Sequence, residues 1–314
     1  MNGKGIGFGK AILFGEHFVV YGLPGIASAI SDITVAEVEK GTKSGWELID
    51  ERPAVPGYKD KKQGEIQRSL DLIFKYMKID LEKNPVKIKL SGNLTCASGV
   101  GASAALASAV ARALNQHFSL NLNDNQINEV AYEGEKGSAG TPSGIDNTCS
   151  TYGGMLSFEK NLLGGPNKIS LLKVKFPMLI VLASTGITQE TKEIVADVKA
   201  EKEKNPEKFE KFFADYKSIY KKAVDAIASG NLGGVGLLMD KNQQLLRDIN
   251  VSCPEIESII STAKSNGALG AKLTGTGRGG LVVCLCSDKK TQEKISMAIN
   301  KTGFETTITE VGKK

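Results

Sequence analysis

The segment 97–104 combines two glycines with small residues and leads directly into an alanine-rich stretch of helical spacing. Gly99 and Gly101 allow the backbone to approach a ligand closely and to adopt conformations that other residues avoid. The helix predicted behind them directs unpaired N–H groups, and the positive end of its dipole, toward the loop. Such a loop can bind phosphate, but it can also cap a helix without binding a ligand. Other segments of the sequence are needed to distinguish these two roles.

A second candidate segment, residues 9–17, has the sequence GKAILFGEH. Lys10, Glu16 and His17 flank an apolar run that should be a buried strand. The segment is not a Walker loop, because Lys4 and Ala11 stand where that motif requires glycine and Ser or Thr. On its own it is compatible with a cluster of functional polar groups or with a plain strand that has charged ends.

A third candidate pairs two acidic residues in neighbouring segments, Glu135 in EGEK and Asp146 in GTPSGIDN. The proline and glycines of the second segment form a stiff turn that presents Asp146 just as the next element begins. The two carboxylates fit one metal ligand and one group that faces an attacking hydroxyl. Alternatively, the segment is a surface turn in which Asp146 caps a neighbour. Ser103, at the predicted helix start, could ligate Mg²⁺, bond phosphate or cap the helix.

The fourth candidate segment, residues 270–280, contains a literal GxGxxG at Gly275, Gly277 and Gly280. A dinucleotide-binding site requires a strand before this pattern and a helix after it. Residues 281–283 (Leu-Val-Val) predict a strand after it instead. A dinucleotide site is therefore not expected here.

Composition bounds the class of protein. The chain has 314 residues, 41% apolar and 24% charged, with a net charge of +5, which suits a two-domain globular protein with a substantial core. Basic residues are mixed with acidic ones, so no nucleic-acid stripe is expected. We also expect no secretory leader and no membrane span, because no apolar run is long enough. Five cysteines without a CxxC pair indicate reduced thiols and a cytoplasmic location, and two histidines give a zinc site little to build on.

Hydrophobic periodicity predicts mixed strands and helices in both halves of the chain, and so an α+β class with a boundary near residue 175. In the first half, strands are expected at 11–14, 18–21, 34–38, 46–49, 86–91 and 153–158, and helices at 64–78, 102–117 and 124–136. In the second half, strands are expected at 178–182, 281–286 and 304–310, and helices at 189–228 (interrupted at 205–206), 254–266 and 289–301.

Taken in this order, the four segments resemble those of the GHMP small-molecule kinases. One branch of this family phosphorylates mevalonate, and this chain is similar to it in the tracts GKAILFGEHFVVYG (9–22), TPSGIDN (141–147) and TYGG (151–154). Arg278 resembles the arginine in the trypanosomatid form of that branch. The resemblance implies a ribosomal-protein-S5-like α/β domain that binds ATP over residues 1–175. A ferredoxin-like α+β domain is implied over residues 176–314.

The resemblance also implies an activity, the transfer of the γ-phosphoryl group of ATP to the 5-hydroxyl of mevalonate in isoprenoid biosynthesis. Asp146 would act beside that hydroxyl as a base or an orienting acceptor, and Lys10 would stabilise the developing charge. Ser103 and Glu135 match the ligands of Mg²⁺. The implied ATP contacts are Ala97, Ser98, Gly99, Val100, Gly101, Ala102, Ser103, Gly275 and Gly277. The implied substrate contacts are Lys10, Glu16, His17, Asp146, Tyr152 and Thr185.

Three residues depart from the pattern of the family. Cys96 replaces a usual proline, Ala102 replaces a commoner serine, and Arg278 adds a cation that either strengthens nucleotide binding or faces solvent. The expected partners are mevalonate and ATP alone, without nucleic acid or membrane, in a monomer or a homodimer. The alternatives are a phosphomevalonate-specific or other small-molecule kinase of the family, and a non-catalytic ligand sensor.

Overall fold

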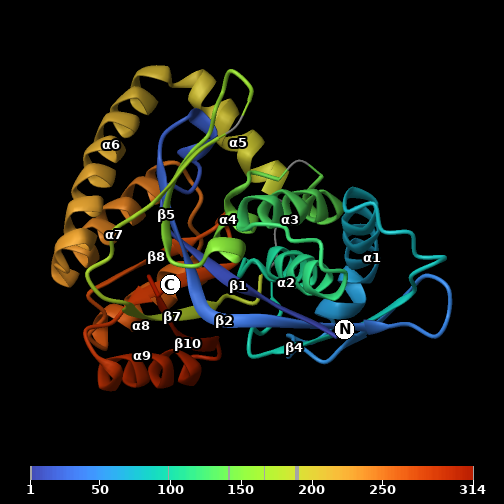
Figure 1. The fold of residues 1–314 in the computed structure, drawn as a ribbon. Coiled ribbons are helices and arrows are strands. Elements are labelled where there is room, and N and C mark those ends of the chain that lie inside the picture. Colours follow the sequence, from blue (N-terminus) through green and yellow to red (C-terminus); the bar gives the residue numbers. More distant parts are fainter. Residues whose placement is uncertain (1, 98, 141, 166, 188–190, 314) are drawn as a thin grey trace. The chain divides into compact units, whose positions relative to one another are not determined.

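The computed structural model describes residues 2–97, 99–140, 142–165, 167–187 and 191–313 (Figure 1). The chain divides into two compact units, one of residues 1–10 and 29–153, the other of residues 11–28 and 154–314. Two strands, β1 (Gly3–Phe14) and β2 (Gly25–Lys40), continue from one unit into the other. The domain boundary expected near residue 175 stays a prediction, because packing units and family domains are defined differently.

The first unit packs helices against a small sheet. Strand β4 (Val86–Gly92) pairs in parallel with β3 (Trp46–Asp50) and antiparallel with β2, which also pairs with β1. Figure 1 shows α1, α2 and α3 lying side by side, and their contacts confirm this packing. The apolar residues of β2, β4 and these helices form one core. The helices are α1 (Tyr58–Tyr76), α2 (Ala102–His117), α3 (Asp124–Ala139) and α4 (Ile145–Tyr152).

Helix α2 lies directly on β1 because alternate residues of the strand are glycines. A Cβ atom on Gly5 would lie 2.2 Å from the carbonyl oxygen of Ala109, and one on Gly7 would lie 2.1 Å from that of Ala105. Residues two apart in a strand and four apart in a helix face their neighbours, so the two small-residue rows match. This contact fixes the strand that carries Lys10 against the helix that follows the glycine loop.

The second unit contains the ferredoxin-like arrangement that the resemblance implied. Its antiparallel strands lie in the order β10-β7-β9-β8, with α8 packed on β8 and β9, and α9 packed on β7 and β10. These elements are β7 (Met178–Ser184), α8 (Pro254–Ser265), β8 (Gly270–Thr274), β9 (Leu281–Leu285), α9 (Lys289–Lys301) and β10 (Glu305–Val311). The others are β5 (Met155–Glu159), β6 (Lys168–Leu171), α5 (Thr191–Lys204), α6 (Pro206–Ser229) and α7 (Leu232–Asp248).

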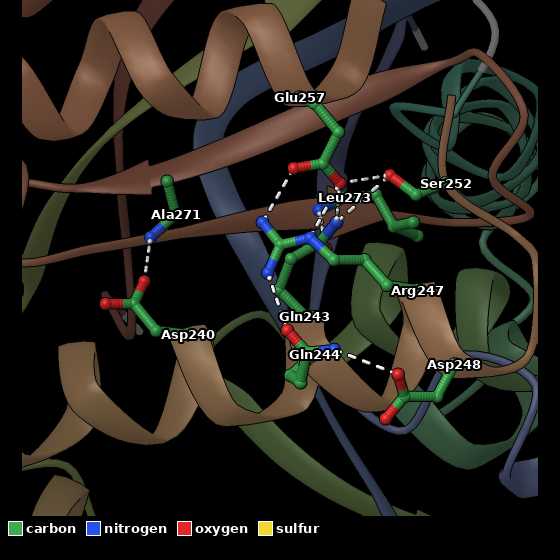
Figure 2. A network of polar contacts seen from close by, with 9 residues as sticks. All are labelled: Asp240, Gln243, Gln244, Arg247, Asp248, Ser252, Glu257, Ala271 and Leu273. Carbon is green, nitrogen blue, oxygen red and sulfur yellow. Dashed lines mark hydrogen bonds and ion pairs between the residues drawn. The ribbon is translucent and has the colours of Figure 1, made fainter. Parts of the chain in front are cut away.

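Strand β8 ends this sheet, and side chains of α7 cover its free edge (Figure 2). The backbone N–H of Ala271 donates to Asp240 Oδ1 (3.0 Å), and that of Leu273 donates to Gln243 Oε1 (3.0 Å). An open strand edge presents unpaired N–H groups, and these two carboxylate and amide oxygens satisfy them. Strand β8, the first part of the fourth glycine segment, is thus held on both sides.

A polar network holds Gln243 in place at that edge (Figure 2). Its amide donates to Ser252 Oγ (3.2 Å) and to Glu257 Oε1 (3.1 Å). Arg247 binds the same Glu257 carboxylate through Nε (2.9 Å) and Nη2 (2.7 Å). The network therefore joins α7, the following turn and α8 to β8.

Most expected elements are present, but several differ from the expectation. Residues 18–21 are not a strand, because Val19–Tyr21 form a 3-10 turn that ends at Gly22 in the left-handed conformation. Helix α3 begins with a capping box on Asn123, so Asp124 is its first residue and not its cap. Helices α4 and α7 and strands β6 and β8 were not among the expected elements. The α+β class is confirmed, and so is the interruption at 205–206, where Pro206 starts α6.

Two further expectations concern the setting of the chain. Within the described residues, no helix combines the length and apolar character needed to cross a bilayer. All five cysteines are free, and four of them are buried.

Candidate functional site

The start of α2 offers unpaired backbone donors to a ligand. Gly101 precedes the helix in the left-handed conformation (φ 72°, ψ 30°), and Gly99 also has positive φ (96°). Gly101 is the N-cap and has no side chain, so Ser103, in the first turn, is not the cap. The first N–H groups of α2 have no partner within the helix, and phosphate binding by this loop stays a prediction. Ser98 lies outside the described residues.

Lys10 lies against the same loop. Its backbone N–H donates to Val100 O (2.8 Å). A Cβ atom on Gly101 would lie 2.8 Å from Lys10 Cγ, so this glycine leaves room for the lysine stem. The Lys10 side chain is 7% exposed, and its Nζ lies 3.4 Å from Asp146 Oδ1. The structure therefore brings together an ammonium and a carboxylate from distant parts of the sequence, beside the glycine loop.

Asp146 occupies the first turn of α4, which begins after Gly144 in the left-handed conformation (φ 90°). Its side chain is 33% exposed, whereas that of Lys10 is almost fully buried. The carboxylate therefore pairs with the ammonium on one side and stays accessible on another. This geometry can hold a hydroxyl group at Asp146 with a positive charge close by.

Glu135, on α3, joins the same cluster. Burial raises its pKa to about 7, and the negative charge of Asp146 acts in the same direction. A hydrogen bond with Ser103, the charge of Lys10 and a hydrogen bond from Ser138 oppose this rise. Lys10, Ser103 and Asp146 all act on the Glu135 carboxyl. These four sequence-predicted residues therefore form one electrostatic cluster.

The donors of this cluster fit Mg²⁺ better than a metal held by protein alone. Among the residues that the structure describes, no three or more His, Cys, Asp or Glu side chains are grouped to hold a metal ion. Glu135 and Ser103 supply two hard oxygen donors, and the raised pKa of Glu135 shows a buried carboxylate that a cation would stabilise. Mg²⁺ keeps several waters and shares phosphate oxygens, so two protein donors suffice.

In the second unit, Glu16 forms a buried ion pair that sequence reasoning missed. Its Oε1 accepts from Lys272 Nζ at 2.5 Å, and both side chains are fully buried. Burial lowers the pKa of Lys272, and the charge of Glu16 opposes this shift. The signal in the sequence was a lysine between the apolar residues Ala271 and Leu273. A substrate contact for Glu16 stays a prediction, because this oxygen already serves Lys272.

His17 follows Glu16 and is also buried. Its φ of 61° is left-handed, and its Nε2 lies 2.6 Å from Thr276 O. Burial lowers its pKa and so does the charge of Arg278, whereas the bond with Thr276 raises it. A neutral ring that donates from Nε2 presents Nδ1 as an acceptor. That Nδ1 is buried without a hydrogen-bond partner in the described part of the chain.

Two predicted substrate residues use their hydroxyl groups within the protein. Tyr152, at the last position of α4, donates to Asn125 Oδ1 (2.5 Å). Thr185 donates to Gly280 O (3.0 Å) and so fixes the end of the fourth glycine segment. Both residues keep their substrate roles only as predictions.

The fourth glycine segment begins with β8, and Arg278 anchors the part that follows the strand. Gly277 has positive φ (85°), and a Cβ atom there would lie 2.2 Å from Val251 O. The Arg278 guanidinium donates to Asn250 O (3.1 Å) and to Asp197 Oδ2 (2.5 Å). These contacts link Arg278 to other parts of the second unit, and its side chain is still 35% exposed, so nucleotide binding and exposure to solvent both stay predictions.

The chain matches two families of known proteins. Residues 66–154 match the GHMP kinases N terminal domain, and residues 223–304 match the GHMP kinases C terminal family. The mevalonate kinase of Thermococcus onnurineus is 32% identical over 96% of this chain and 94% of its own length. That of Pyrococcus furiosus is 31% identical over 97% of this chain and 95% of its own length.

The fold also matches solved structures. The crystal structure of L. major mevalonate kinase in complex with R-mevalonate superimposes with a TM-score of 0.94 at 38% identity, over 98% of this chain and 95% of that one. This match confirms the likeness to a trypanosomatid enzyme. The chain matches both domain families and is 32% identical to a relative over 96% of its length. It therefore belongs to the GHMP kinase family.

Proposed function

We propose that this protein transfers the γ-phosphoryl group of ATP to the 5-hydroxyl of mevalonate. The observation that carries the proposal is the pair of Lys10 and Asp146, 3.4 Å apart beside the glycine loop that begins α2. The family membership supports a kinase, and the relatives and the matched structure are themselves named mevalonate kinases. A non-catalytic sensor would have no need to keep this pair intact.

In the proposed reaction, the substrate hydroxyl binds at the accessible side of Asp146. Its oxygen bonds to the γ-phosphorus while the bond to the leaving ADP breaks, and the hydroxyl proton passes to Asp146. A loose transition state for phosphoryl transfer needs proton removal only late, so positioning and charge stabilisation carry most of the catalysis. Lys10 supplies that charge, and its burial keeps the ammonium from being screened by water.

The residues of the loop and of the first turn of α2 hold the phosphates in this proposal. Their backbone N–H groups point out of the helix start, where the dipole favours negative charge. Ser103 and Glu135 would hold Mg²⁺, which neutralises charge on the phosphate oxygens when it is bound. The resemblance also assigns Gly275 and Gly277 to the nucleotide, and of the two only Gly275 has open space where a Cβ atom would lie.

His17 is the proposed substrate contact with the clearest physical reason. Its buried Nδ1 is an acceptor without a partner among the described residues, and such a group is stabilised by a hydroxyl donor. Mevalonate carries two hydroxyl groups, of which one is not phosphorylated. We therefore assign Nδ1 of His17 to a hydroxyl of mevalonate. A cytoplasmic location also stays a proposal, supported by the five free cysteines.

A coupled assay of ADP release tests the proposal with four acceptors: mevalonate, phosphomevalonate, galactose and homoserine. We expect turnover with mevalonate and little with the others. Asp146→Asn should lower kcat by roughly 10²–10⁴-fold while ATP binding survives. Preference for phosphomevalonate would replace the assigned substrate, and near-normal turnover of Asp146→Asn would remove Asp146 from the mechanism.

A further inference from the structure

A buried arginine connects β3 to the helix that begins at the glycine loop. Arg52 is only 4% exposed although it is charged. Its Nε and Nη2 donate to the two carboxylate oxygens of Asp50 at 3.0 and 2.7 Å, and its Nη1 donates to Ala102 O at 3.2 Å. Ala102 is the first residue of α2. One planar guanidinium thus ties the end of a strand to the first turn of that helix.

The far side of this connection is itself fixed. Asp50 is the last residue of β3, paired in parallel with Leu90 of β4. Lys59 donates to the backbone carbonyl of Asp50 at 2.7 Å, and its ammonium lies 3.5 Å from Asp50 Oδ1. Arg52 therefore acts from a rigid base, and its charge is largely balanced by Asp50 before any ligand binds.

The same segment also grips the entry of the glycine loop. The N–H of Cys96 donates to Pro53 O (2.7 Å), and the N–H of Val55 donates to Cys96 O (3.1 Å). Residues 50–55 thus hold the chain just before the loop, at Cys96, and just after it, at Ala102. A proline at position 96 could not donate the first of these bonds.

We propose that Arg52 is a positioning residue for ATP, which holds the first turn of α2 so that its N–H groups meet the phosphates. The inference rests on the proposed function, because it takes the start of α2 as the phosphate site. The first turn of a helix has few hydrogen bonds of its own, and this one follows two glycines with positive φ. Arg52 supplies the lateral support that this turn lacks.

The test separates nucleotide binding from general stability. Arg52→Met should raise the KM for ATP on the order of tenfold, because a displacement of ~1 Å in a phosphate site is costly. The KM for mevalonate should change by less than about twofold, because Arg52 contacts the start of α2 and not the proposed mevalonate site. A uniform loss of folded protein would change neither KM, so a rise in the KM for ATP alone reports on the phosphate site. Arg52→Lys should resemble Arg52→Met, since one ammonium cannot reproduce the planar fork.

Arg112→Met is the matched control. Arg112 lies further along α2 and makes similar contacts, with Asp124 Oδ1 (2.5 Å) and Thr151 O (3.0 Å). The variant Arg112→Met should lower the melting temperature without raising the KM for ATP. Equal increases in both variants, no increase in a folded Arg52→Met, or full recovery in Arg52→Lys would each overturn the assignment.

A second measurement does not depend on activity. Hydrogen exchange of peptides that cover residues 99–106 should be faster in Arg52→Met than in Arg112→Met. If Arg52→Met does not fold, Asp50→Asn provides a milder weakening of the same fork and should show the same local change. Unchanged exchange in this region overturns the inference. Failure of the wild-type protein to use ATP, with the exchange difference present, would instead refute the proposed function.

Discussion

Replacing Lys272 by methionine should destabilise the protein strongly, although it keeps a stem of similar length. Lys272 Nζ lies 2.5 Å from Glu16 Oε1, and both side chains are fully buried. It also donates to Leu273 O at 2.6 Å. Without the ammonium, the Glu16 carboxylate would be left as an unbalanced charge in the interior.

Removal of one partner from a buried ion pair costs about 3–5 kcal/mol, whereas replacement of both by apolar residues is often nearly neutral. Lys272→Met should therefore lower the free energy of unfolding by an amount in this range at pH 7. The double variant Lys272→Met/Glu16→Met should recover most of the loss.

Urea unfolding followed by circular dichroism measures all four corners of this cycle. The ion pair of Lys313 and Glu310 serves as a control in the same unit, with side chains 64% and 27% exposed. Lys313→Met should cost less than about 1 kcal/mol. The reasoning fails if Lys272→Met costs no more than this control, or if the double variant loses the sum of the two single losses.

Three other variants test single features. Burial raises the pKa of Glu135 from 4.5 to about 7, so the folded protein keeps a proton that the unfolded chain has released. The ligand-free protein should lose about 3 kcal/mol of stability between these pH values, and Glu135→Gln should abolish this slope in urea titrations; an unchanged slope would contradict the assignment. Arg278→Gly should leave the KM for ATP within about twofold, because Asp197 already engages the guanidinium and glycine suits a φ of 50°; a large rise would restore a nucleotide role. Cys96→Pro should lower stability by about 1–3 kcal/mol in thermal melts, more than Cys96→Ala, because it removes the bond to Pro53 O; equal effects would show that this bond is unimportant.

Elements with a plain periodic pattern could be predicted from the sequence. The alanine-rich stretch after Gly101 shows the spacing of a helix, and α2 occupies 102–117 as expected. Pro206 marks the break between α5 and α6, because proline suits the first turn of a helix. The contact between Lys10 and Asp146 is different. No local pattern encodes it, and only the resemblance to a family placed the two residues in one site.

The elements that were missed are those in which tertiary contacts override local preference. Helix α7 contains glycines at its start, which disfavour a helix in isolation. Gly236 is nonetheless required there, because a Cβ atom would lie 2.4 Å from Leu269 O where the helix meets the start of β8. Strand β8 was hidden by the charge of Lys272, which becomes compatible with a buried strand only through Glu16.

Gly101 shows why a glycine motif cannot be assigned to one cause from its letters. Its left-handed φ of 72° ends the loop and leaves the first N–H groups of α2 open to an anion. The same missing side chain makes room for the stem of Lys10, whose Cγ would lie 2.8 Å from an added Cβ. Any side chain at position 101 would both displace Lys10, which pairs with Asp146, and disturb the loop. Phosphate binding and placement of the ammonium are therefore two demands on one position, and a variant of Gly101 cannot separate them, whereas variants of Lys10 and Arg52 can.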